Sequence, residues 1–175
     1  GTDRQQAACA LAFLALRSTS CQHPLVAAAL VLTARMEPAA VGEVITQEQS
    51  TVLMLQSMML SEVDMVSQHA CAIACAAAAT GAERASSMVV SGVGATALQL
   101  LRGRRAPPVR ASALMVIGDV GLASDDGAAK LFAMEGLREL LVGMCDGGLG
   151  AARTAKPAGS GPREAPAEGA PAGDA

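Results

Sequence analysis

Apolar residues recur at helical spacing in two stretches of the chain, one near the middle and one toward the end. Between residues 93 and 101 and between residues 137 and 144 they return every three or four positions, as on the buried face of an α-helix. The positions expected to face the core are Val93, Ala97, Leu100, Leu101, Leu137, Leu141 and Met144. Polar residues fall on the opposite, outer face of the same helices: Gln99, Arg102, Arg138 and Glu139. The pattern therefore predicts two amphipathic helices, each with a buried and a solvent-facing side.

The chain also resembles itself at a spacing of about 42 residues, a period typical of helical repeat proteins. Residues 23–32 align with residues 107–116 at an offset of 84, and residues 67–74 align between them. In repeat proteins of this kind each unit buries its apolar face against its neighbours. We predict a partial repeat at residues 1–21 and full repeats at residues 22–63, 64–105 and 106–148.

Glycine and proline mark the helix boundaries within these repeats. Gly92 and Gly136 stand where a short second helix must end and turn into a third, a place that suits the left-handed backbone open to glycine. Pro107–Pro108 stand at the start of a repeat, where proline is tolerated in the first helical turn. In the repeat at residues 22–63, residues 49–50 occupy the place of the glycine. Each of the other two repeats is expected to read helix, short helix, glycine, helix.

The composition favours an all-α fold. Apolar residues make up 51% of the chain and aromatic residues only 1%, so the core must be filled by Ala, Leu, Val and Met, which suit helix packing. Residues 151–175 are rich in Ala, Pro and Gly and contain no Leu, Ile, Val, Met or Phe, so they cannot offset the entropy of ordering. We therefore predict a helical repeat domain over residues 1–150 and a disordered tail over residues 151–175.

Charge and cysteine content restrict the setting in which the protein works. A net charge of -3 and an isoelectric point near 5.3 oppose binding to nucleic acid or anionic lipid. The longest apolar runs have ten residues, whereas a membrane-spanning helix needs about 20. The cysteines lie scattered in apolar stretches and resemble buried, reduced thiols: Cys9, Cys21, Cys71, Cys75 and Cys145. We expect a cytoplasmic protein that binds neither nucleic acid nor membrane. Because the sequence lacks an initiator Met and enters a helical pattern at once, we also expect it to be part of a longer chain.

No set of catalytic or cofactor-binding residues stands out. Cys71 and Cys75 share a helix face near His69, but no second pair of metal ligands is visible, and small buried thiols explain them better. Residues 92–94 lack the preceding strand and the following Lys of a phosphate loop. Residues 125–126, both Asp, fit a turn between helices. We therefore predict no enzyme activity, no cofactor and no metal site.

A basic cluster follows the helix predicted at residues 93–101. It contains Arg102, Arg104, Arg105 and Arg110. Arginine near a helix C-terminus interacts favourably with the helix dipole, so a solvated face explains the cluster, and an acidic partner is the alternative.

The last two repeats resemble the armadillo repeat. The segments that carry the resemblance are Gln68–Ala70, Thr80–Glu83, Gly92–Val93, Val109–Leu114, the turn Ser124–Asp126, and Glu135–Leu141. The resemblance covers roughly residues 5–148. It implies a right-handed α-solenoid of about three to four repeats, whose third helices line a groove that holds a peptide or partner protein.

This resemblance implies an interaction scaffold or adaptor, with Gln99, Arg102, Arg138 and Glu139 on the groove side. The chain contains no Asn, the residue with which nuclear import receptors grip peptide backbones, so recognition of a nuclear localisation signal is not expected. A second resemblance leaves an alternative open. Residues 70–121 are similar to the UCS-domain myosin chaperones, which would imply a chaperone module that acts on myosin with a heat-shock chaperone partner.

Overall fold

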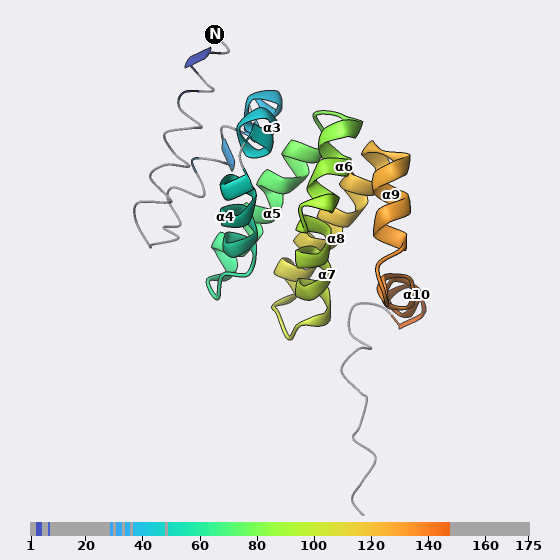
Figure 1. Ribbon diagram of the computed structural model, residues 1–175. Coiled ribbons are helices and arrows are strands. Elements are labelled where there is room, and N and C mark those ends of the chain that lie inside the picture. The colour runs from blue at the N-terminus through green and yellow to red at the C-terminus, as the bar shows by residue number, and fades with distance from the viewer. Residues whose placement is uncertain are drawn as a thin grey trace, which may run out of the picture.

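The computed structural model describes residues 37–47 and 49–147, together with a few isolated positions before residue 37. This part of the chain is helical and contains no strand (Figure 1). Its helices are α3 (Pro38–Gln47), α4 (Gln49–Met59), α5 (Asp64–Ala78), α6 (Ala82–Val90), α7 (Val93–Arg102), α8 (Pro107–Ala123), α9 (Asp125–Phe132) and α10 (Leu137–Gly147). The all-α prediction is confirmed for the described residues. The predicted partial repeat at residues 1–21 and the predicted tail at residues 151–175 lie outside them.

The helices recur at a nearly constant spacing. The starts of α5 and α8 lie 43 residues apart, as do the starts of α6 and α9, and α7 and α10 start 44 residues apart. The same spacing of 44 separates α3 from α6 and α4 from α7. We call α5, α6 and α7 the first triplet and α8, α9 and α10 the second triplet. Helices α3 and α4 correspond to the last two helices of a preceding triplet.

Corresponding helices of successive triplets pack against each other. Helix α5 packs against α8, α6 against α9, α3 against α6 and α4 against α7. The last helix of one triplet also packs against the first helix of the next, as α7 does against α8. Figure 1 shows α3, α6 and α9 following one another across the molecule, with α4 and α7 in a second row. Each layer of helices therefore shields the next from water.

Glycine in the left-handed region ends the second helix of each triplet. Gly92 has φ of +92° and Gly136 has φ of +73°, as the sequence predicted. The backbone N–H of Gly92 donates to the carbonyl of Val89, which closes the last turn of α6. Helix α7 then begins at Val93. The glycines thus set the angle at which the second helix passes into the third.

Helix α9 begins earlier than the sequence suggested. The doublet Asp125–Asp126 lies in the first turn of α9 and not in a turn between helices. Ser124 is the N-cap, and its hydroxyl accepts a hydrogen bond of 3.1 Å from the backbone N–H of Gly127. The expected inter-helix turn is therefore reduced to one residue, and the two carboxylates instead face the positive end of the α9 dipole.

The core-facing positions predicted for the third helices are confirmed for α7 and only in part for α10. Val93, Ala97, Leu100 and Leu101 are all buried, and so is Leu137. Full burial of a Leu or Val side chain contributes roughly 1.5–3 kcal/mol.

In contrast, Leu141 and Met144 are half-buried and Cys145 is exposed, contrary to expectation. The reason is that α10 packs chiefly against α9, and no further helix follows it among the described residues. None of the helices in this part of the chain is long and apolar enough to cross a membrane.

Candidate functional site

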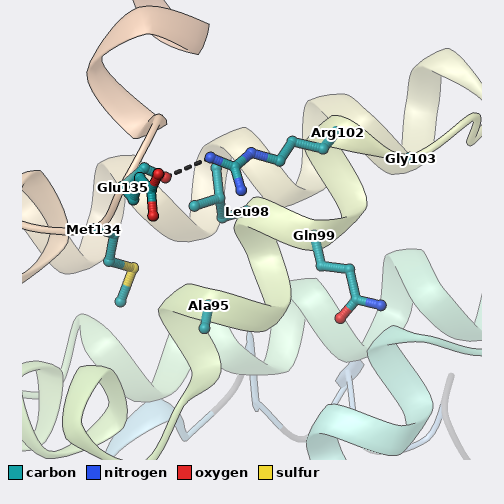
Figure 2. A pocket seen from close by; sticks show the side chains of 7 residues that line it. All are labelled: Ala95, Leu98, Gln99, Arg102, Gly103, Met134 and Glu135. Atoms are coloured by element: carbon teal, nitrogen blue, oxygen red, sulfur yellow. Dashed lines mark hydrogen bonds between the residues drawn. The ribbon is translucent and has the colours of Figure 1, made fainter.

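A shallow groove of about 570 Å³ separates α7 from the turn between α9 and α10 (Figure 2). Helix α7 lines one side, and the turn that leads to Gly136 lines the other. The lining residues are Ala95, Leu98, Gln99, Arg102, Gly103, Met134 and Glu135. The groove therefore lies at the joint between the first and the second triplet, where the third helix of one meets the glycine turn of the next.

The apolar part of the groove arises from close packing of α7 against the end of α9. Gly94 permits this packing, because a Cβ atom there would lie 2.7 Å from Cδ2 of Leu131 and 3.1 Å from Cε of Met134. Leu98, one turn further along α7, is nearly buried, and Met134 is half-buried. Leu98 and Met134 together give the groove an apolar surface that an apolar side chain of a ligand could contact.

The polar part of the groove is held across the joint by Arg102. Its guanidinium donates a hydrogen bond to the backbone carbonyl of Glu135, and Figure 2 shows the side chain reaching from α7 to that turn. A Cβ atom at the following residue, Gly136, would collide with the same guanidinium. The positive φ therefore favours glycine at this position, and any larger residue would also displace the end of the Arg102 side chain. Gln99 leaves α7 in a different direction and is exposed (Figure 2).

The structure brings together two of the four predicted site residues. Gln99 and Arg102 line the groove, whereas Arg138 and Glu139 do not. Both of the latter are exposed in the first turn of α10, beyond the glycine turn. Sequence reasoning missed Leu98, Met134 and Glu135 as lining residues. For Met134 and Glu135 the available signal was their place directly before the repeated glycine, Gly136.

The basic cluster is divided between two joints. Arg105 lies 3.4 Å from the carboxylates of both Glu62 and Asp64, and it also donates to the backbone carbonyl of Ser61. Ser61 and Glu62 lie just before α5, and Asp64 is its first residue. Arg102 lies in the last turn of α7, where a positive charge favours the helix dipole as predicted, and its side chain also reaches the carbonyl of Glu135. Arg105 lies beyond the end of α7, and its side chain is instead paired with residues at the start of α5.

A second polar cluster connects α6 to α9. Asp126 accepts hydrogen bonds from the Ser86 hydroxyl and, at 2.6 Å, from Nζ of Lys130. Lys130 also donates to the Ser86 hydroxyl at 3.0 Å. The hydrogen bonds from Lys130 and Ser86 hold the pKa of Asp126 below its usual value. Since Asp126 is exposed, this cluster is a surface link between the triplets.

The two cysteines of α5 lie at the interface with α8. Cys71 is buried and Cys75 half-buried, and both are free thiols. Burial raises the pKa of Cys71 to about 12. Burial, together with a hydrogen bond to Asp119 of α8, also raises the pKa of Cys75. Their environment favours the neutral thiol, which is a poor nucleophile and a poor metal ligand.

Neither family models, nor curated proteins, nor solved structures give a match to this chain. The resemblances to armadillo repeats and to UCS-domain chaperones accordingly remain predictions, and so does the absence of enzyme activity.

Proposed function

We propose that the chain is a right-handed α-solenoid of armadillo type that works as a scaffold or adaptor, binding a peptide or a segment of a partner protein. The spacing of 43 to 44 residues between corresponding helices supports the solenoid, together with the packing of α5 on α8, α6 on α9, α3 on α6 and α4 on α7. In such an array stability is a sum of unit and interface terms, and one continuous surface runs along the stacked third helices. In this chain α4 and α7, which pack on each other, would form that surface.

The observation that carries the proposal is the groove beside α7. It joins an apolar surface, Leu98 and Met134, to two side chains rich in hydrogen-bonding groups, Gln99 and Arg102. An exposed primary amide both donates and accepts hydrogen bonds, so Gln99 can pair with the backbone of an extended peptide. The Arg102 guanidinium has five N–H donors. It donates to the backbone carbonyl of Glu135, and its other N–H groups can reach a ligand. This combination suits a peptide better than a small polar metabolite.

A peptide display experiment tests the proposal. Random peptides are selected on the immobilised wild-type protein, and the affinity of an enriched peptide is then measured by fluorescence anisotropy. We expect Gln99→Ala and Arg102→Ala to weaken binding by about tenfold each, the equivalent of about 1.4 kcal/mol. Arg138→Ala shows whether the bound segment extends onto α10.

The control is Val90→Ala, which truncates an exposed side chain of α6 that does not line the groove. Thermal unfolding of every variant separates lost recognition from lost folding. Gln99 is decisive here, because it is exposed and its replacement should leave the melting temperature unchanged. The proposed binding site would be refuted by enriched peptides that bind the Gln99 and Arg102 variants as tightly as the wild type.

A cytoplasmic setting belongs to the same proposal. It is supported by Cys71, Cys75 and Cys145, which are all free thiols. A reducing compartment keeps such thiols unpaired. Fractionation of cells that express a tagged chain tests it, and recovery in an oxidising compartment with these cysteines paired would contradict it.

A further inference from the structure

The apolar face of α10 loses its cover from the start of the helix to its end. Residues that recur every three or four positions form this face: Leu137, Leu140, Leu141, Met144 and Cys145. Leu137, at the start, is buried. Leu140, Leu141 and Met144 are half-buried, and Cys145 is exposed. The apolar face of α7 is buried along its whole length, so α10 differs from α7 in being anchored at its start and open toward its end.

Helix α10 also does not stack on α7 as α7 stacks on α4. Helices α4 and α7 pack against each other, as the first helices and the second helices of successive triplets do. Among the described residues no packing of that extent joins α7 to α10, which packs chiefly on α9. Figure 1 shows α7 from the side and α10 almost along its axis, so α10 takes a different direction. The stacking of third helices therefore stops at α7.

The groove lies where a stacked α10 would begin. In the first joint Gln56 of α4 donates to the carbonyl of Ser91, and α7 starts two residues later and packs on α4. In the second joint Arg102 of α7 donates to the carbonyl of Glu135, and α10 likewise starts two residues later. The groove separates α7 from this same turn. It is thus the space beside α7 that α10 would take if it packed as α7 does on α4.

The turn before α10 supplies a hinge at the edge of the groove. Gly136 joins Glu135, which lines the groove, to the first residue of α10, and glycine accepts a wider range of backbone angles than other residues. Helix α10 has 11 residues and is about 16 Å long. The part of α7 that lines the groove, from Ala95 to Gly103, is about 12 Å long. A helix that turns about Gly136 is therefore long enough to cover the groove.

We propose that α10 is a lid, which swings about Gly136 and lays its apolar face on Leu98 and Met134, the apolar floor of the groove. The structure shows the open position. Closing removes half-buried apolar side chains and the groove floor from water together. By helical spacing Glu139 falls outside the apolar face, so its charge stays in solvent when the lid closes.

The lid would regulate the proposed function, because α10 and a peptide cannot fill the same groove at the same time. The apparent affinity for a peptide is then reduced by the fraction of molecules in which the lid is closed. This role rests on the proposed peptide groove. The movement of α10 does not, and it can be measured without a ligand.

Disulfide trapping tests the movement. Ala95→Cys and Gln99→Cys each place a thiol on the part of α7 that lines the groove, and Cys145 supplies an exposed thiol near the end of α10. Oxidation with diamide at low protein concentration should join Cys145 to at least one of them, because a disulfide forms only when the two Cα atoms come within about 7 Å. Mass spectrometry identifies the bond. Ala111→Cys, exposed on α8 and outside the groove, is the control and should pair with Cys145 at least about tenfold more slowly.

A charge on the apolar face of α10 should hold the lid open. We expect Met144→Asp to slow the trapping reaction by at least about tenfold, because closing would bury a carboxylate against the groove floor. Val142→Asp adds the same charge at an exposed position of α10 outside the apolar face and should leave the rate unchanged. Circular dichroism shows whether both variants keep their helices.

The outcomes separate the lid from the ligand of the groove. If neither groove cysteine pairs with Cys145 faster than the cysteine of Ala111→Cys does, the lid is overturned and the peptide proposal stands. Equal trapping rates for Met144→Asp and Val142→Asp overturn it as well. A peptide selected on the wild type should slow the trapping reaction, and the trapped chain should bind it at least about tenfold more weakly than the reduced chain. Trapping in a chain that selects no peptide supports the lid and refutes the proposed function.

Discussion

The side-chain amide of Gln56 donates a hydrogen bond of 2.6 Å to the backbone carbonyl of Ser91, the residue directly before the left-handed Gly92. Arg102 does the same one triplet later, donating to the carbonyl of Glu135 directly before Gly136. In both cases a long polar side chain of a third helix crosses to the glycine turn of the next triplet. The two joints therefore share one means of fixing how successive helical layers meet, and at the second joint it forms a wall of the groove.

Removal of the Gln56 amide should loosen the first joint. We expect Gln56→Ala to lower the free energy of unfolding by about 1 kcal/mol, because the Ser91 carbonyl loses its side-chain donor. Urea unfolding followed by circular dichroism measures the change. Gln49→Ala, at an exposed position of the same helix, is the control and should change stability far less. Equal effects of the two substitutions would show that the hydrogen bond does not stabilise the joint.

Substitution of the turn glycines should be costly for two separate reasons. Gly92→Ala and Gly136→Ala force a side chain into a left-handed backbone, a cost of order 1–3 kcal/mol. At Gly92 the new Cβ would also lie 2.9 Å from the Gln56 amide nitrogen, so the hydrogen bond to Ser91 must shift.

Gly118→Ala on α8 is the control for these variants, because a Cβ there meets nothing within 4 Å and its φ is not positive. Alanine favours the helix interior over glycine by about 1 kcal/mol, so Gly118→Ala should stabilise the chain. Melting temperatures of the three variants give the comparison. Similar melting temperatures for Gly92→Ala and Gly118→Ala would contradict the role assigned to the turn.

The repeat period and the glycine turns could be read from the sequence, because both are local patterns of residue type. Gly92 and Gly136 were expected in the left-handed region for this reason, and the structure places them there. The buried face of α7 followed from helical spacing alone. The repeat period could not predict the direction in which long side chains point. Arg102 reaches a carbonyl 33 residues away, a contact that depends on how two helical layers are set against each other.

Only two of the four predicted site residues line the groove, and the physical reason is the same. Gln99 and Arg102 lie on the exposed side of α7, which helical spacing gives directly. Arg138 and Glu139 are also exposed, but they lie in the first turn of α10, and the groove ends at the turn before them. Helix α10 packs chiefly on α9 and has no following layer among the described helices, so it does not repeat the surroundings of α7. Helical spacing predicts which residues of a helix are exposed. Whether those residues line a groove depends on which element of the fold lies opposite them.

The link between α6 and α9 should make stability depend on acid pH. Lys130 and Ser86 hold the pKa of Asp126 below its usual value. The contribution of Asp126 to the stability of the fold is therefore fully present above the unfolded pKa. It is lost as the pH falls through the lower, folded pKa. Asp126→Asn should therefore lower the melting temperature at neutral pH, and the difference from the wild type should shrink in acid. Asp125→Asn removes a charge from the same helical turn, and the structure records no bonding partner for its side chain. If the two variants show the same pH profile, the hydrogen-bonded cluster does not explain the effect.

The buried thiols should make stability depend on alkaline pH. Burial raises the pKa of Cys71 from an ordinary value near 9.0 to about 12, so the folded chain keeps its proton while the unfolded chain loses it. The contribution of Cys71 to the free energy of unfolding is fully present below the unfolded pKa. It falls as the pH rises from 9 toward 12, by up to about 1.4 kcal/mol per pH unit. Unfolding by urea at several alkaline pH values measures the slope, and Cys71→Ala should reduce it. Cys145→Ala is the matched control, because that thiol is exposed and its removal should leave the slope unchanged. A slope that is the same in both variants would mean that Cys71 ionises as readily in the folded chain as in the unfolded one.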